Sequence, residues 1–141
     1  MNQNPIFEKT RRVEWCETDE SGTLHFANYV RFMEETEYAF LRSIGLSVVL
    51  QDEKGSIGFP RRKCEFDILQ PARFEQNLTT RIAGLKVDGV VVEYRFEVVS
   101  DEGLVARGFF QAACCRFPAD KPPYAILIPE SVMERMTPHA R

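Results

Sequence analysis

The sequence WCETDESGTLHFANYV, residues 15–30, joins an expected strand to an expected helix and gathers acidic groups at the junction. Glu17, Asp19 and Glu20 fall within four positions, and Gly22 follows them. A helix start leaves backbone N–H groups without partners and carries the positive end of the helix dipole. Acids at such a place often serve as caps, but a carboxylate beside free amides also suits attack on a carbonyl group. The stretch is therefore interpreted either as a solvated acidic loop or as a catalytic loop.

Downstream of this junction, apolar residues recur at helical spacing from about residue 28 to residue 44. The predicted apolar stripe consists of Tyr29, Phe32, Met33, Thr36, Phe40 and Ile44. Arg31 and Glu35 form an i,i+4 pair on the other side. Gly45 can adopt the left-handed conformation that commonly ends a helix. A long helix with so wide an apolar face needs a sheet to pack against.

Alternating patterns in the rest of the chain predict that sheet. The expected strands are residues 7–16, 59–68, 78–86, 90–98 and 104–117. An Asp-Gly pair at 88–89 predicts a hairpin, and the last strand is apolar on both faces, as in the centre of a sheet. Residues 128–136 add a short terminal helix. The prediction is one α+β domain over residues 1–141, with a long helix on a five-stranded antiparallel sheet. A partner subunit is expected to cover the second face of the sheet.

Composition narrows the functional classes. The 141-residue chain has a net charge of −3, which provides no surplus of cations for nucleic acid. No apolar run reaches the roughly 18 residues of a membrane span, and the N-terminal segment is too polar for a signal peptide. We therefore expect a cytoplasmic protein without a membrane or nucleic-acid partner. The spacing of the four cysteines fits no zinc site, so they are interpreted as buried thiols and no metal is expected.

Several motifs together resemble the hotdog-fold thioesterases, specifically the 4-hydroxybenzoyl-CoA thioesterase and short-chain acyl-CoA thioesterase branch. The similarity covers roughly residues 8–117. The matching positions are Val13, Thr18-Asp19, Gly22, Ala27-Asn28-Tyr29, Phe32, Glu34 or Glu35, Leu41, Arg42 through Gly45-Leu46, and Gln70-Pro71-Ala72-Arg73-Phe74. The resemblance implies the hotdog fold, in which a long helix is wrapped by a five-stranded antiparallel sheet. It also implies a homodimer or homotetramer with active sites at the subunit interface.

The resemblance further implies hydrolysis of an acyl-CoA or acyl-carrier-protein thioester, without a cofactor beyond the coenzyme A of the substrate. Asp19 matches the catalytic carboxylate, and the backbone N–H of Phe26 matches the group that polarises the thioester carbonyl. His25 is a third catalytic candidate, although many relatives have the aromatic residue first and the His second. Other departures are Glu17 in place of an aspartate, and Gln76 in place of an acid. The predicted substrate-binding residues are Gly22, Asn28, Tyr29, Arg61, Arg62 and Lys63.

Two of these assignments have alternatives in the sequence. The basic run at residues 61–63 is either a contact for the phosphates of coenzyme A or a charged edge strand that resists aggregation. The whole domain either cleaves an acyl thioester, binds one without cleaving it, or serves only in assembly. Asp19 discriminates between the first two functions, because a protein that only binds the thioester has no need for a buried carboxylate there.

Overall fold

The computed structural model describes residues 4–141, so the first three residues of the predicted domain lie outside the described part of the chain. The main elements are a long helix, a large sheet and a smaller sheet. In chain order they are β1 (Phe7–Arg12), a 3₁₀ turn (Trp15–Glu17), α1 (Ala27–Ser43), β2 (Leu50–Asp52), β3 (Gly55–Gly58), β4 (Arg61–Ile68), β5 (Asn77–Asp88), β6 (Val91–Ser100), β7 (Gly103–Ala113), β8 (Cys115–Phe117), β9 (Tyr124–Ala125), α2 (Glu130–Met136) and a 3₁₀ turn (Thr137–His139).

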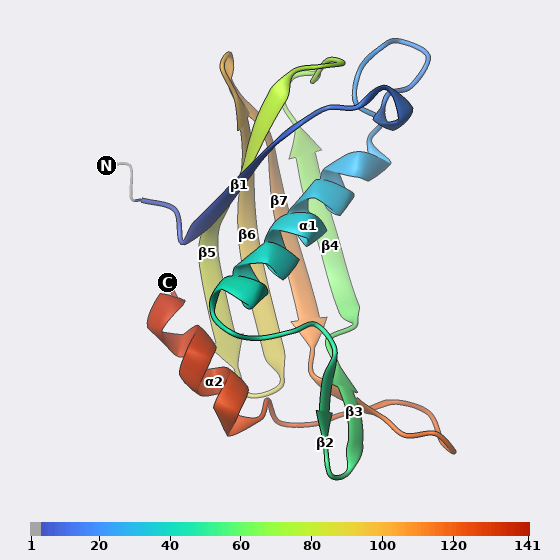
Figure 1. Cartoon of the computed structure of the whole chain (residues 1–141), viewed down its shortest axis with the longest axis vertical. Coiled ribbons are helices and arrows are strands. Elements are labelled where there is room, and N and C mark those ends of the chain that lie inside the picture. Colours follow the sequence, from blue (N-terminus) through green and yellow to red (C-terminus); the bar gives the residue numbers. More distant parts are fainter. Residues whose placement is uncertain (1–3) are drawn as a thin grey trace.

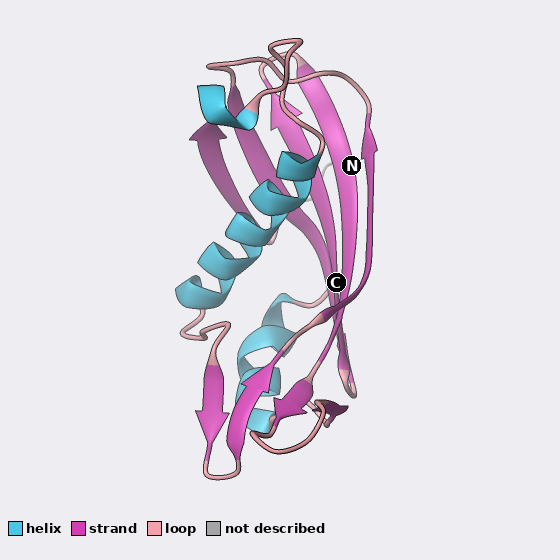
Figure 2. Cartoon of the chain, turned by 90° about the vertical axis from the view of Figure 1, so that its right-hand side faces the viewer, coloured by secondary structure: helices cyan, strands magenta, loops and turns pink. Residues whose placement is uncertain are grey.

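The large sheet has five strands in the order β1-β5-β6-β7-β4, and every neighbouring pair is antiparallel. Helix α1 lies diagonally across one face of this sheet (Figure 1). The sheet curves around the helix, and no helix of residues 4–141 covers its other face (Figure 2). The predicted α+β fold with a five-stranded antiparallel sheet is confirmed.

The core lies between α1 and the inward side chains of β5, β6 and β7. The predicted alternation of β6 is confirmed, because Val92, Tyr94, Phe96 and Val98 are buried. Gly108 of β7 faces the helix, and a Cβ at this position would overlap the end of the Met33 side chain. Glycine there allows the helix to lie close to the middle of the sheet. The apolar stripe of α1 is buried as predicted, except that Ile44 is half-buried, and Glu37 is buried within it.

Element ends differ from the sequence prediction where the chain turns. The first strand ends at Arg12, because the next residues form the 3₁₀ turn that leads into the acidic loop. The predicted last strand is divided, with β7 ending at Ala113 and β8 joining the second sheet, whose order is β2-β3-β8-β9. Strands β2 and β3 were not predicted, because three and four residues are too short to show a periodicity. The short terminal helix is present as α2.

Candidate active site

The acidic loop folds back on itself immediately before α1. The Asp19 N–H donates to the Thr23 carbonyl at 2.9 Å, and the Gly22 N–H donates to the Asp19 carbonyl at 3.0 Å. Gly22 has a φ of +78°, a left-handed conformation that favours glycine. Gly22, a predicted substrate-binding residue, shapes the turn in the single chain, and its carbonyl accepts the Phe74 N–H at 3.3 Å.

The Asp19 side chain is exposed to solvent in the single chain. Its Oδ1 atom accepts the Ser21 N–H at 2.9 Å and also the Ser21 hydroxyl. Hydrogen bonds from the Ser21 side chain and backbone lower the pKa of Asp19 below its ordinary value, and His25 contributes to the same lowering. The carboxylate is therefore ionised near neutral pH, although it is not buried as the sequence interpretation supposed.

The start of α1 leaves one backbone amide open. The Ala27 N–H donates to the Nδ1 atom of His25 at 3.1 Å, and the Asn28 N–H donates to the His25 carbonyl at 2.9 Å. Within residues 4–141, the Phe26 N–H makes no hydrogen bond. His25 therefore caps the helix through its ring and carbonyl, and the Phe26 amide next to it is left without an acceptor in the described chain.

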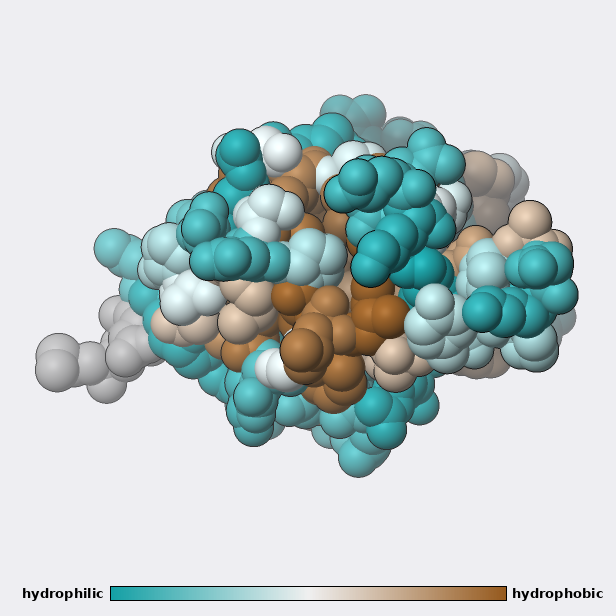
Figure 3. Space-filling model, turned by 90° about the horizontal axis from the view of Figure 1, so that it is seen from below, coloured by the Kyte–Doolittle hydropathy of each residue, from teal (hydrophilic) through white to brown (hydrophobic). Residues whose placement is uncertain are grey.

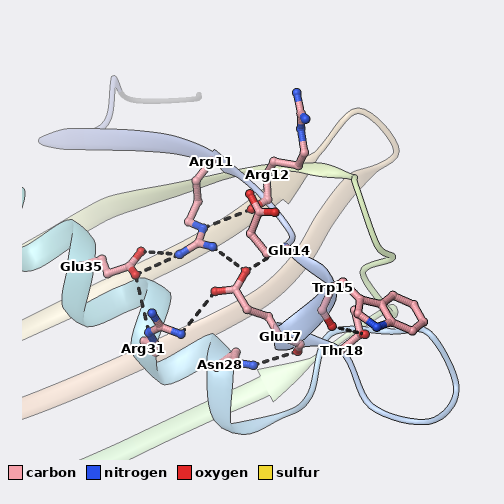
Figure 4. Close-up of polar contacts among 9 residues, drawn as sticks. All are labelled: Arg11, Arg12, Glu14, Trp15, Glu17, Thr18, Asn28, Arg31 and Glu35. Atoms are coloured by element: carbon pink, nitrogen blue, oxygen red, sulfur yellow. Dashed lines mark hydrogen bonds and ion pairs between the residues drawn. The ribbon is translucent and has the colours of Figure 1, made fainter.

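Glu17 holds this loop in place, although the sequence analysis assigned it no function. Its side chain is only 3% exposed and pairs with Arg11 of β1 and Arg31 of α1 (Figure 4). The Glu17 carbonyl accepts two further hydrogen bonds, from the His25 N–H at 2.9 Å and from the Asn28 side-chain amide at 2.8 Å. One residue thus connects the edge strand, the acidic loop and the first turn of the helix.

Glu35 completes this network from the next turn of α1. Its carboxylate accepts two hydrogen bonds from Arg11, both at 2.9 Å, and lies 3.7 Å from Arg31 (Figure 4). The predicted pairing of Arg31 with Glu35 is confirmed. Two arginines therefore face two glutamates, and the buried charge of Glu17 is compensated by the partly buried Arg11 and the exposed Arg31. The sequence shows that Arg11 and Glu17 lie close together along the chain, but it does not show that their side chains form an ion pair.

Two predicted substrate-binding residues lie at the helix start but in different surroundings. Asn28 uses its side chain to anchor the loop through the Glu17 carbonyl. Tyr29 is 1% exposed, its ring stacks on Phe66 of β4 at 6.2 Å, and burial raises the pKa of its hydroxyl. In the single chain Tyr29 is thus a core residue. Phe26, by contrast, is 61% exposed and stacks on His25 at a ring separation of 4.7 Å.

The basic run at the start of β4 divides into two parts. Arg61 turns toward α1, where its guanidinium pairs with Glu37 and Glu34. Arg62 and Lys63 are exposed, and Lys63 lies 3.0 Å from the equally exposed Glu65. The strand has a bulge between Arg61 and Lys63, which interrupts the regular alternation that would place both side chains on the same face. Of the three cations, Arg62 and Lys63 are accessible to a ligand, and Arg61 is occupied by carboxylates of its own chain.

Across residues 4–141, no cluster of three or more His, Cys, Asp or Glu side chains is placed to hold a metal ion. In the same part of the chain, no helix is both long enough and apolar enough to cross a membrane.

Comparison with known proteins identifies the class to which this fold and loop belong. The profile of the Thioesterase-like superfamily matches residues 13–136, and the chain belongs to this family. The predicted family is thereby confirmed. Among individual relatives, the chain is 24% identical over 119 residues to a 1,4-dihydroxy-2-naphthoyl-CoA hydrolase of Thermosynechococcus vestitus, covering 84% of this chain and 82% of the relative. A local match of 35 residues, 51% identical, spans 25% of this chain and 27% of an Aquifex aeolicus protein named as an esterase.

Solved structures show the same fold. A 1,4-dihydroxy-2-naphthoyl-CoA thioesterase from Synechocystis superposes with a TM-score of 0.79 at 20% identity, covering 93% of this chain and 95% of that structure. A gentisyl-coenzyme A thioesterase gives a TM-score of 0.76 at 21% identity, covering 91% and 98%. At this level of identity the likeness establishes the fold and not the substrate.

The Glu17 network generates a prediction about stability. Replacing Glu17 by Ala removes its charge-assisted bonds to Arg11 and Arg31, although Arg11 keeps its bonds to Glu35, and should lower the free energy of unfolding by about 2 kcal/mol. Urea denaturation of the purified protein measures this change. The matched control is Glu8→Ala, because Glu8 pairs with Arg81 at 3.1 Å on the exposed surface and its removal should cost less than about 1 kcal/mol. Equal losses in the two variants would contradict the assigned role of Glu17.

Proposed function

We propose that this protein hydrolyses acyl-CoA thioesters, with Asp19 as the catalytic carboxylate and the Phe26 N–H as the donor to the thioester oxygen. The observation that carries the proposal is the unbonded Phe26 amide at the positive end of α1, in the same loop-to-helix segment as Asp19, whose pKa is lowered by hydrogen bonds from Ser21 and by the neighbouring His25. Membership of the Thioesterase-like superfamily supports this reaction class. Relatives named for the hydrolysis of aromatic CoA thioesters support coenzyme A as the thiol, although an acyl-carrier-protein thioester has the same reacting group.

The chemistry follows from the charge that develops during the reaction. When a nucleophile attacks the thioester carbon, negative charge accumulates on the carbonyl oxygen. A hydrogen bond from the Phe26 N–H, reinforced by the helix dipole, stabilises that charge more than it stabilises the neutral substrate. Asp19 either attacks the carbon itself, giving a mixed anhydride that water then hydrolyses, or removes a proton from an attacking water. Both routes end with a free carboxylic acid and a thiol.

His25 has a defined place in this scheme. Because its Nδ1 atom accepts the Ala27 N–H, the neutral ring carries its proton on Nε2. That N–H is available to donate to the sulfur of the leaving thiolate or to the attacking water. The side chain also fixes the helix start, so His25 acts both in positioning the Phe26 amide and as a candidate proton donor.

We infer that a second copy of the chain completes the site, as a homodimer or as part of a homotetramer. Asp19 is exposed in the single chain, whereas electrostatic stabilisation is strongest where water is excluded. Strand β4 lies at an edge of the large sheet, and Ile68 and Leu69 are 44% and 51% exposed at its end. Pairing of two β4 strands would give hydrogen-bond partners to the unpaired backbone groups of this edge and would cover these apolar side chains.

The accessible cations suggest how coenzyme A is held. Arg62 and Lys63 can contact its phosphates, since both are exposed and neither is needed in the core. Arg61, one of the predicted phosphate contacts, is excluded from this proposal by its pairing with Glu34 and Glu37.

The role of Asp19 is tested by Asp19→Asn, which preserves the size of the side chain and removes its charge. Turnover of an acyl-CoA, followed by release of free thiol, should fall about 10²-fold or more, because the nucleophile or base is lost. Glu20→Gln changes the neighbouring exposed acid and should leave the rate unaltered. Tight binding of acyl-CoA by a wild-type protein without turnover would instead indicate a subunit that binds the thioester and does not cleave it.

The role of the Phe26 amide is tested by Phe26→Pro, which removes the N–H. Phe26 has a φ of −55°, close to the value of about −65° that proline requires, and its amide makes no hydrogen bond within the described chain. The variant should therefore keep its melting temperature while its turnover falls about 10²–10³-fold. Phe26→Ala removes the aromatic ring, retains the N–H and should keep most of the rate. A folded proline variant with full activity would exclude this amide as the oxyanion donor.

The phosphate contacts are tested by the double variant Arg62→Ala/Lys63→Ala. Its KM for an acyl-CoA should rise about tenfold, because two charge-assisted contacts are lost while the reacting groups stay in place. The same acyl group on N-acetylcysteamine, which lacks the phosphates, is the control substrate, and its KM should not change. An equal rise for both substrates would show that the two cations act elsewhere.

A further inference from the structure

A cavity of about 270 Å³ lies under the C-terminal half of α1, away from the acidic loop. Its apolar wall comes from α1, β6, β7, α2 and the segment before β4. Representative lining residues are Leu41, Val92, Ala112, Val132, Met136 and Phe59. Viewed from this end of the molecule, hydrophobic surface gathers near the centre and is bordered by hydrophilic side chains (Figure 3). An apolar cavity of about 150 Å³ holds a benzene-sized guest, so this one accommodates a substituted ring, two fused rings or a short chain.

One end of the cavity is polar. Glu37 and Arg61 are its charged lining residues, and Tyr38 and Tyr94 add hydroxyl groups. The Arg61 guanidinium donates to Glu37 through both terminal nitrogens and to Glu34 at 3.3 Å. Burial raises the pKa of Glu37, and the neighbouring Arg61 opposes that rise.

The charges and hydrogen-bonding groups of this pair determine which polar group of a ligand can bind beside them. Glu37 and Arg61 are the charged residues of the lining and their charges balance, so a ligand carboxylate or ammonium would add an uncompensated charge to a poorly hydrated place. An ammonium group would lie against Arg61 and could only donate hydrogen bonds. Three of the five N–H groups of Arg61 are used in the bonds above, which leaves donors beside the glutamate acceptors. An uncharged hydroxyl can donate to a carboxylate and accept from Arg61 at the same time.

We propose that this cavity binds an apolar molecule, or the apolar part of a larger one, that ends in an uncharged hydroxyl group. The ring or chain fills the space between α1, β6, β7 and α2. The hydroxyl group reaches the Glu37–Arg61 pair and exchanges hydrogen bonds with both partners.

Two sources could supply this chemistry. Glu37 follows the first residue of α1 by ten positions, about 15 Å along the helix axis, so the cavity is separate from the thioester site of its own subunit. The start of α1 lies near the far end of β4 from Arg61 (Figure 1). Antiparallel pairing of two β4 edges would reverse the second copy and bring its helix start toward the cavity. The ligand is then either the acyl group of a thioester held there, which rests on the proposed function, or a free small molecule, which does not.

Isothermal titration calorimetry with four matched probes tests the site directly. The probes are 4-propylphenol, propylbenzene, 4-propylbenzoate and 4-propylbenzylamine. The phenol should bind about tenfold more tightly than propylbenzene, because its hydroxyl bonds to charged groups, and the two charged probes should bind most weakly. Equal affinity for all four probes, or tightest binding of the benzoate, would overturn the assignment of the polar end.

Substitutions in the cavity lining test whether the probes bind inside the cavity. Val132→Phe fills the cavity from α2 and should abolish binding of the phenol, whereas Val49→Phe makes the same change at a residue that is 76% exposed and outside the lining. Glu37→Gln should increase the affinity for 4-propylbenzoate at least about tenfold by removing one negative charge. Glu93→Gln, on the outward face of β6, should not change it. Melting curves confirm that each variant is folded, and unchanged phenol binding by a folded Val132→Phe protein would overturn the proposal.

Kinetics then identifies the source of the ligand. In the wild-type enzyme, competitive inhibition of thioester hydrolysis by 4-propylphenol assigns the cavity to the acyl group, and non-competitive inhibition or no inhibition assigns it to a free molecule. The calorimetric titrations measure binding alone and do not require the protein to hydrolyse a thioester. A protein that binds the phenol but does not cleave thioesters would therefore contradict the proposed function and leave the cavity site standing.

Discussion

The geometry of the candidate site depends on the buried carboxylate of Glu17. An unpaired charge at such a place would cost several kcal/mol, and the cost is offset only while Arg11 and Arg31 remain in position. Arg11 belongs to the edge strand β1, and Arg31 lies one turn into α1. The pairing therefore fixes the helix relative to the sheet at the end where the helix begins. The carbonyl of the same residue holds the His25 N–H and the Asn28 side chain, which fixes the loop as well.

This arrangement explains why a single amide is left open. Glu17 accepts the N–H of His25, and His25 in turn accepts the N–H groups of Ala27 and Asn28. The N–H of Phe26 falls between these two sets of bonds and finds no acceptor in the described chain. In most helices a side chain or water satisfies such a group. Here the His25 ring accepts the Ala27 N–H, two positions along the chain, and the Phe26 N–H between them is left without an acceptor within residues 4–141.

The sequence predicted the elements better than it predicted the environment of the charged groups. Helical spacing identified α1 within one residue at each end, and alternation identified the five long strands, because both patterns follow from burial of one face. The loop residues proposed for the site came from the resemblance to the hotdog thioesterases, because their types and order alone fit a solvated, capping loop as well. The burial of Glu17 was not, since an acid in an acidic loop is ordinarily exposed. The occupation of Arg61 could not be seen either, because its partner Glu37 is 24 positions away.

The two halves of α1 are tied down by separate groups of charges. Glu35 and Glu17 share Arg11 and Arg31 beside the open amide, and Glu34 and Glu37 share Arg61 beside the cavity. Apolar side chains of similar volume would stabilise such positions as well or better, because buried ion pairs lose most of their attraction to desolvation. Stability alone therefore does not account for either group. Under the proposed function, the first group fixes the helix start whose amide would bind the thioester oxygen. Under the proposal for the cavity, the second group supplies polar partners for a ligand in an otherwise apolar space.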